Sequence, residues 1–169
     1  LLRALRKLHL EGFEDYKLKI YGAEGPVTND IKNFISDNFL SNHIEYLGFV
    51  NDSVLFKALS NSLFVVLPSI GSENSNCVIR ESNALGKMVL GSRIGGIPEQ
   101  IKDKETGFLF APGDINDLSS KIKYLFENPQ VAIKCGKNSI AHVGERSDKQ
   151  YFYTQLLQTY TKSIESYNK

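Results

Sequence analysis

The sequence has 169 residues, of which 41% are hydrophobic, and this is enough for one compact domain with a sizeable core. Lys and Arg number 20 against 19 Asp and Glu, so the net charge gives no reason to expect a nucleic-acid partner and favours a small ligand. The two cysteines and three histidines are scattered and no apolar run approaches the ~20 residues that span a bilayer, so we expect no disulfide framework, no metal site and a cytoplasmic protein.

The chain opens with Leu1, Leu5 and Leu8 at helical spacing, which predicts an amphipathic helix. A β-type run over 16–21 then leads through a glycine-containing turn to a helix over 28–39, with its cap near Thr28 or Asn29. This unit of strand, loop and helix repeats. The further strands are expected over 43–47, 63–67, 87–91 and 107–110, and the further helices over 54–59, 77–85 and 115–127. The cluster Asn51, Asp52 and Ser53 is expected to cap the first of these helices, and Asp114 the last.

Alternation of strands and helices at this spacing predicts an α/β fold. Because the run Leu63–Leu67 is apolar on both faces, we expect a Rossmann-like, doubly wound parallel sheet with helices on both faces, in a single domain over residues 1–169. After Pro129 the pattern is wholly helical. The final helix, over 147–169, packs either on its own domain or toward another one.

In an open parallel sheet, ligands bind outside the carboxyl ends of the strands. The most informative loop there is 68–76, which follows a predicted strand and leads straight into a helix. Small polar residues at a helix start leave backbone N–H groups for an anion such as a diphosphate, although an ordinary capped helix explains them equally well.

Glu81 is the carboxylate of most interest in the helix that follows. It shares a helical stripe with Cys77, Ala84 and Leu85, which places its side chain on or beside the face toward the core. Its neighbour Arg80 points elsewhere, so the two hydroxyls of a ribose are candidate donors to it. The alternative is a solvated carboxylate at the edge of the helix.

Several short blocks resemble one family in order and spacing. They are Pro68 with Ser69, Glu73, the run 74–81, Ala84, Gly86 with Lys87, the run 95–99 and the run 106–109. This set is similar to the C-terminal domain of the family 4 retaining glycosyltransferases, which have the two-domain GT-B architecture. Glu73 and Glu81, with seven residues between them, resemble the paired-glutamate motif of that family.

The resemblance implies that this is the donor-binding half of such an enzyme. Glu73 would be the catalytic-site residue, touching hydroxyls of the donor sugar, and Glu81 would hold the ribose. The other donor-binding residues implied are Asn74, Ser75, Asn76 and Cys77 against the sugar and diphosphate, Phe49 and Val50 beside the base, and Gly22 beside the nucleotide. Core packing is the alternative for Phe49 and Val50, and a turn with positive φ is the alternative for Gly95 and Gly96.

The activity implied is transfer of a hexose-type sugar, with retention, from a nucleoside diphosphate sugar (a UDP-sugar or GDP-sugar) to an acceptor hydroxyl in polysaccharide or glycolipid synthesis. No metal and no cofactor is expected. The partner is an N-terminal acceptor domain, and the strand and the Arg- and Lys-bearing loop that begin such domains would precede Leu1, so we expect a truncated start and an inactive isolated chain. Membrane contact would be peripheral, at the inner face, through the full-length enzyme.

Two other functions stay open. A nucleotide-binding module without catalysis would keep this pocket, and a sugar-nucleotide epimerase of the same architecture binds its donor through the same half. A nicotinamide-dependent dehydrogenase is excluded because no GxGxxG run follows a predicted strand.

Overall fold

The computed structural model describes residues 1–71, 73–147 and 149–167, so Ser72 of the predicted loop and residues 148, 168 and 169 of the predicted final helix lie outside it. The helices are α1 (Leu2–Leu10), α2 (Thr28–Asp37), α3 (Asp52–Asn61), α4 (Cys77–Ala84), α5 (Ile97–Gln100), α6 (Ile115–Glu127), α7 (Pro129–Ser147) and α8 (Lys149–Tyr167). The strands are β1 (Leu18–Tyr21), β2 (Ile44–Gly48), β3 (Val65–Leu67), β4 (Val89–Ser92) and β5 (Gly107–Phe110).

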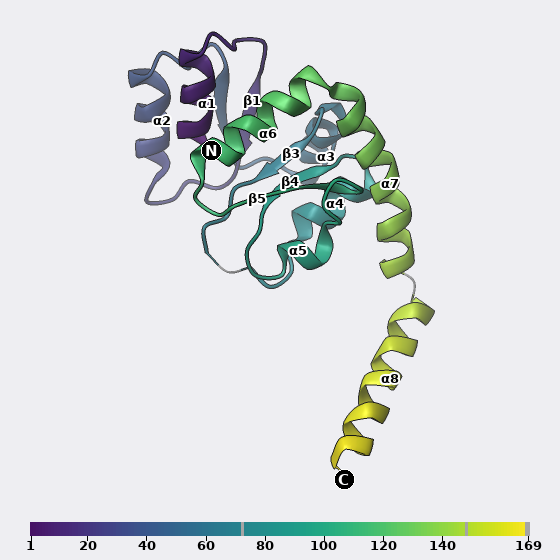
Figure 1. Ribbon diagram of the computed structural model, residues 1–169. Coiled ribbons are helices and arrows are strands. Elements are labelled where there is room, and N and C mark those ends of the chain that lie inside the picture. Colours follow the sequence, from purple (N-terminus) through teal and green to yellow (C-terminus); the bar gives the residue numbers. More distant parts are fainter. Residues whose placement is uncertain (72, 148, 168–169) are drawn as a thin grey trace.

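All strand pairs are parallel, as predicted, but they form two hydrogen-bonded groups (Figure 1). β1 pairs with β2, and β3, β4 and β5 form a three-stranded sheet in that order. β3 is an edge strand, and its residues are only partly buried rather than buried as predicted. The α/β class with helices on both faces is confirmed.

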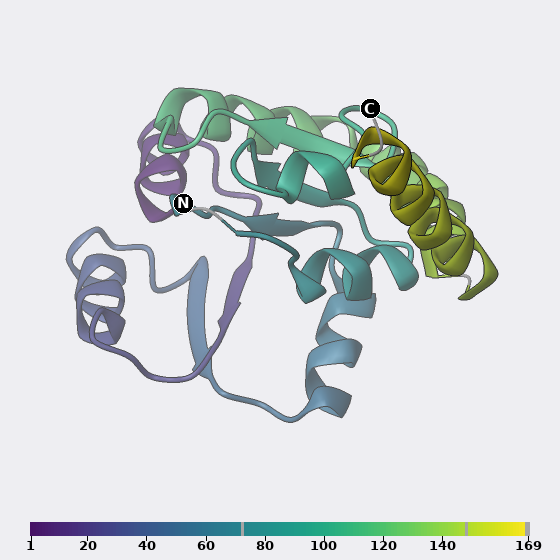
Figure 2. The same ribbon diagram turned by 90° about the horizontal axis from the view of Figure 1, so that it is seen from below.

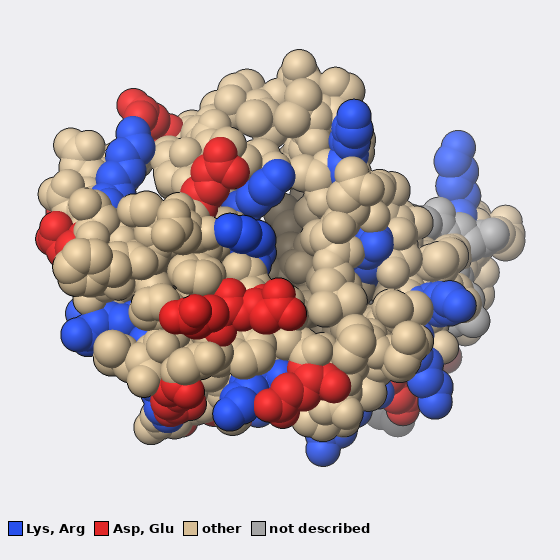
Figure 3. All heavy atoms as spheres, turned by 90° about the horizontal axis from the view of Figure 1, so that it is seen from above, with Lys and Arg blue, Asp and Glu red and all other residues tan. Residues whose placement is uncertain are grey.

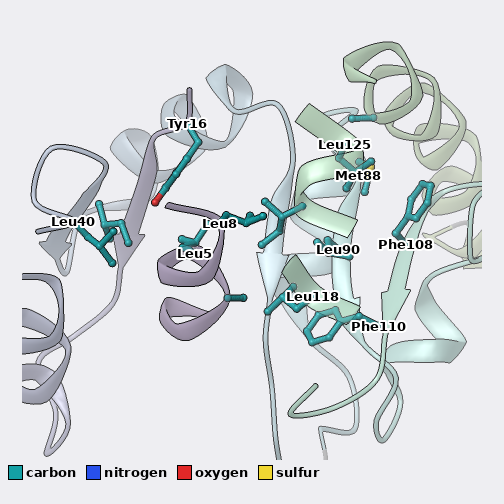
Figure 4. Packing of buried hydrophobic residues seen from close by; sticks show 14 of the residues in the cluster. Leu5, Leu8, Tyr16, Leu40, Met88, Leu90, Phe108, Phe110, Leu118 and Leu125 are labelled. Carbon is teal, nitrogen blue, oxygen red and sulfur yellow. The ribbon is translucent and has the colours of Figure 1, made fainter. Parts of the chain in front are cut away.

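Alternate residues of β4 and β5 enter two separate hydrophobic clusters. Leu90 and Phe108, together with Met88 just before β4, belong to a cluster with residues of α1 and α6, whose packing Figure 4 shows. Val89 and Leu109 belong to the second cluster, together with residues of α4 and α5. Since the residues of both strands are buried throughout, helices cover both faces of this sheet.

The predicted caps are found at the starts of α3 and α6, and α4 has a side-chain cap as well. The side chains of Asn51, Asn76 and Asp114 accept hydrogen bonds from backbone N–H groups at the starts of α3, α4 and α6. The cap predicted near Thr28 or Asn29 is wrong. The residue before α2 is Val27, which has no capping side chain, and the Thr28 hydroxyl instead accepts from the Gly25 N–H, so it closes the preceding turn.

Helix α7 packs against the turn between α4 and β4. The backbone of Gly136 lies so close to Gly86 that a Cβ built on Gly136 would overlap the Gly86 carbonyl oxygen. Gly86 itself has a φ of +70°, which favours glycine. Two glycines therefore allow α7 to approach α4.

Helix α8 extends away from the rest of the protein (Figure 1). None of its described residues is buried, and its exposed apolar side chains include Phe152, Leu157, Tyr160 and Ile164. The alternative in which the final helix packs on its own domain is therefore wrong for residues 149–167.

Candidate functional site

The loops at the carboxyl ends of the strands lie at one edge of the protein, which Figure 2 views from below. Parallel pairing places the ends of β1 and β2 together and the ends of β3 and β4 together. The loops that follow these strands contain the predicted site residues 22, 49, 50 and 73–77.

Glu73 is the most firmly held side chain of the loop after β3. One carboxylate oxygen accepts a hydrogen bond from Ser69 Oγ and the other accepts one from Asn76 Nδ2. These two hydrogen bonds lower the pKa of Glu73, and partial burial acts more weakly in the opposite direction. Glu73 is therefore a carboxylate at neutral pH, with its orientation fixed from both sides.

The residues around Glu73 are open to a ligand. Asn74, Ser75 and Cys77 are exposed, and Cys77 is the first residue of α4. Its thiol accepts a hydrogen bond of 3.2 Å from Arg80 Nη2, so the Arg80 guanidinium turns toward the start of the helix. A polar, accessible helix N-terminus beside a fixed carboxylate can hold an anion and a hydroxyl-bearing group at once.

The turn after β4 braces this loop. The Gly96 N–H donates a 2.6 Å hydrogen bond to the Glu73 carbonyl oxygen. The side-chain amide of Gln100 lies against Asn76, where its nitrogen donates to the Asn76 carbonyl at 3.2 Å and its oxygen accepts from the Asn76 N–H at 3.1 Å once the amide is oriented to fit. The loop is thus held by α5, a short helix that the sequence did not predict.

Gly95 and Gly96 have different roles. Gly95 has a φ of +54°, as the turn alternative predicts. Gly96 has a φ of −82°, so that prediction is wrong for it, and its need for glycine comes from its close approach to Asn74.

The loops after β1 and β2 form a second linked pair. The Gly22 N–H donates to the Gly48 carbonyl at 3.0 Å, and the Tyr46 hydroxyl contacts the Gly22 carbonyl at 3.1 Å. Phe49, which follows directly, is 80% exposed, so core packing is wrong for this residue, while Val50 is partly buried. An exposed aromatic ring beside Gly22 can stack on a planar ligand.

Glu81 does not lie on the core-facing side of its helix, so that prediction is wrong. The buried residues of α4 are Ile79, Ser82 and Asn83, whereas Cys77, Ala84 and Leu85 are exposed. Glu81 lies on the side of α4 away from the buried face and is partly buried. Within the part of the chain that the structure describes, its carboxylate has no hydrogen-bond donor or cation partner.

Sequence reasoning missed Ser69, Gln100 and Tyr46 as residues that organise these loops. Ser69 belongs to a block that resembles the family but has no role assigned by the sequence, Gln100 follows the predicted turn, and Tyr46 belongs to a predicted strand. Their contacts depend on the loop conformation, which no spacing rule predicts.

Charge distribution, potential metal ligands and helix hydrophobicity each bear on whether the protein has another kind of site. Figure 3, from above, shows acidic and basic side chains intermixed on the face opposite to that of Figure 2. Among the described residues there is no group of three or more potential His, Cys, Asp or Glu metal ligands. The described helices include none that is long and apolar enough to cross a membrane.

Comparison with known proteins gives consistent results. An uncharacterised glycosyltransferase of Methanocaldococcus jannaschii is 34% identical over 124 residues, which is 73% of this chain and 34% of that protein. The Anabaena protein HepE, solved in complex with UDP-glucose, has the same fold with a TM-score of 0.77 and 23% identity over 96% of this chain and 44% of its own. The C-terminal domain of the group 1 glycosyl transferase LpcC of Francisella tularensis has a TM-score of 0.72 and 22% identity over 85% of this chain and 75% of its own.

This chain spans about a third of the length of the M. jannaschii relative. Residues 1–142 match the family described as glycosyl transferases group 1. The chain therefore belongs to the glycosyl transferases group 1 family and corresponds to the C-terminal part of a GT-B glycosyltransferase.

Proposed function

We propose that residues 1–169 form the nucleotide-sugar-binding domain of a retaining glycosyltransferase. The full-length protein would transfer a hexose-type sugar from a nucleoside diphosphate sugar to an acceptor hydroxyl, in polysaccharide or glycolipid synthesis. The complex of HepE with UDP-glucose supports a UDP-sugar as the first donor to test.

The fixed carboxylate of Glu73 is the observation that carries this proposal. It lies at the carboxyl edge, three residues before the N-cap of α4, among exposed polar neighbours. A carboxylate with two hydrogen bonds still has acceptor sites for sugar hydroxyls, and the start of α4 favours a diphosphate. Charge that builds on the leaving diphosphate would be stabilised by these backbone dipoles, with Glu73 positioning the sugar rather than attacking it.

The other site residues keep their proposed roles. Phe49, which is exposed, and Val50, which is partly buried, would border the base, with Gly22 beside the nucleotide. Glu81 would accept the ribose hydroxyls, and this role rests on the family motif, since its helix does not bury it. The acceptor and any general base would come from an N-terminal domain, and closure of the two domains would exclude water.

The proposal is tested on the full-length protein by calorimetry against UDP-, GDP- and ADP-sugars. We expect one class of donor to bind and Glu81→Ala to weaken it by about tenfold to a hundredfold, the loss of hydrogen bonds to a charged group. Glu127→Ala is the matched control, since Glu127 is an exposed glutamate at the far end of α6. Unchanged affinity in Glu81→Ala removes the ribose role.

Product analysis then separates the candidate activities. A transferase that retains configuration gives a glycoside with the anomeric configuration of its donor, which NMR coupling constants report. Release of an epimeric sugar nucleotide without an acceptor would establish the epimerase instead. Donor binding with neither reaction would establish the non-catalytic module.

A further inference from the structure

Asn76 makes contacts in three directions. Its Oδ1 accepts a 2.9 Å hydrogen bond from the Val78 N–H and so caps α4. Its Nδ2 donates to one carboxylate oxygen of Glu73. Its own N–H and carbonyl are both within hydrogen-bond distance of the Gln100 amide. The side chain of Asn76 therefore links the start of α4 to the loop carboxylate, and its backbone links the same residue to α5.

The second oxygen of Glu73 is held independently by Ser69, at the beginning of the same loop. An ionised carboxylate offers about four acceptor positions, so two hydrogen bonds leave positions on both oxygens. The bonds from Ser69 and Asn76 remove the rotational freedom of the carboxylate without using up its capacity. This is the arrangement that a pre-organised binding group requires.

We infer that Asn76 is a positioning residue for the sugar-transfer site. Its side-chain amide holds the Glu73 carboxylate in the orientation that receives the donor sugar, and Gln100 holds the backbone of Asn76. The inference rests on the proposed function of Glu73. It adds that the orientation of this carboxylate depends on the amide donor of Asn76 and on the contact of α5 with the loop.

Capping and positioning are separable by substitution. Asn76→Asp keeps an oxygen that caps α4, because Asp and Asn are comparable N-cap residues, but it removes the N–H donor and places a second negative charge beside Glu73. Asn76→Ser keeps a capping oxygen without the added charge. The matched control is Asn51→Asp, since Asn51 caps α3 through its Oδ1 and the Val54 N–H, at 3.1 Å.

The first experiment follows the side-chain carboxyl carbon of Glu73 by NMR as a function of pH, in this chain and its variants. The lowered pKa of Glu73 in the wild type supports the contact with Asn76. We expect Asn76→Asp to move the midpoint upward by about one pH unit and Asn76→Ser by less, while Asn51→Asp leaves it in place. An unchanged midpoint in Asn76→Asp, with circular dichroism and thermal unfolding like the wild type, overturns the inference.

The second experiment measures kcat and KM of the full-length protein with the sugar nucleotide that the wild type uses. Misplacing a reacting group by about 1 Å costs up to about a hundredfold in rate, so we expect Asn76→Asp to lower kcat by about tenfold to a hundredfold, with a smaller effect on KM. We expect the kcat values of Asn76→Ser and Gln100→Leu to lie between those of Asn76→Asp and the wild type. The acidic limb of the kcat profile moves to higher pH in Asn76→Asp, and by less in Asn76→Ser.

The two experiments distinguish an error in the positioning role from an error in the proposed function. If the wild-type protein turns over no sugar nucleotide, the proposed function is wrong, while the carbon titration still decides whether Asn76 controls Glu73. If the wild type is active and Asn76→Asp keeps its kcat and pH profile, the positioning role is wrong and the proposed function stands.

Discussion

Gly96 and Asn74 are in direct backbone contact, so that a Cβ built on Gly96 would overlap the Asn74 carbonyl oxygen. The same glycine donates its N–H to the Glu73 carbonyl at 2.6 Å. The turn after β4 and the loop after β3 are therefore fitted to each other without space for any side chain. Because the clash would involve backbone on both sides, a rotamer change cannot relieve it.

Gly96→Ala is therefore expected to displace the loop that carries Glu73. We expect donor affinity to fall by at least about tenfold, and the free energy of unfolding to fall by about 1–3 kcal/mol, the usual cost of overpacking. Calorimetry with the donor and urea unfolding measure the two effects. Retention of both wild-type values would show that the loop adapts to a methyl group at no cost.

Two glycines of helix α7 form a matched pair. A Cβ on Gly136 would overlap the Gly86 carbonyl oxygen, whereas a Cβ on Gly144 would meet no atom within 4 Å. We expect Gly144→Ala to stabilise the protein by about 0.5–1 kcal/mol, since alanine favours the helix. Gly136→Ala should destabilise it by about 1–3 kcal/mol. Urea unfolding of both variants gives the signs, and equal signs would contradict the packing of α7 on α4.

Tyr16 is 4% exposed, and its hydroxyl has no hydrogen-bond partner among the described residues. Burial, and secondarily the charge of Glu14, raise the pKa of Tyr16 above its usual value of 10.0. A raised pKa means that the folded state disfavours ionisation, so the stability contributed is complete below pH 10 and is lost as the pH rises through the folded-state value.

The Tyr16→Phe variant should therefore lose less stability than the wild type as the pH rises into the alkaline range. At neutral pH we expect it to leave the free energy of unfolding unchanged or to raise it by about 1 kcal/mol, since it removes an unpaired buried hydroxyl. Thermal unfolding between pH 7 and pH 11 checks both expectations. Tyr167→Phe is the control, because Tyr167 is 91% exposed. An identical alkaline loss in Tyr16→Phe and the wild type would contradict the assignment.

Removal of residues 148–169 should leave the rest of the protein folded. No described residue of α8 is buried, so its deletion exposes little of the core. We expect the thermal midpoint of the shortened chain to lie within a few degrees of the full chain. A shorter form ending before Gly136 is the contrasting variant, since it removes the contact with Gly86 and should unfold cooperatively at a much lower temperature, if it folds at all. Equal loss in both truncations would show that α8 stabilises the body.

Elements bounded by clear turn or cap residues were predicted well from the sequence. Strand β5 has the predicted bounds Gly107–Phe110. Asn51, within the predicted cap cluster, caps α3, and Asp114 caps α6 as expected. A small polar residue before an amphipathic run is a local signal that the fold did not override. The cap predicted near Thr28 is wrong because the Thr28 hydroxyl accepts from the Gly25 N–H instead.

The candidate site was less predictable. The stripe argument for Glu81 is wrong because α4 has only eight residues and its buried face contains the polar Ser82 and Asn83, which hydropathy assigns to the surface. The contacts of Glu73 with Ser69 and Asn76 depend on a loop conformation that is set partly by α5. Helix α5 was read as a turn because glycines and Pro98 dominate its start.

Gly107 determines how β5 lines up with β4. It pairs with Val89, and a Cβ at this point would overlap the Val89 carbonyl oxygen. A slip of one residue would place Thr106 or Phe108 opposite Val89, where no side chain can begin. It would also exchange the contents of the two hydrophobic layers, because neighbouring residues of a strand face opposite ways. Gly107 thus excludes the shifted pairing of β5 with β4 on steric grounds. Because residues of β5 enter both hydrophobic layers, this single glycine sets the alignment of both.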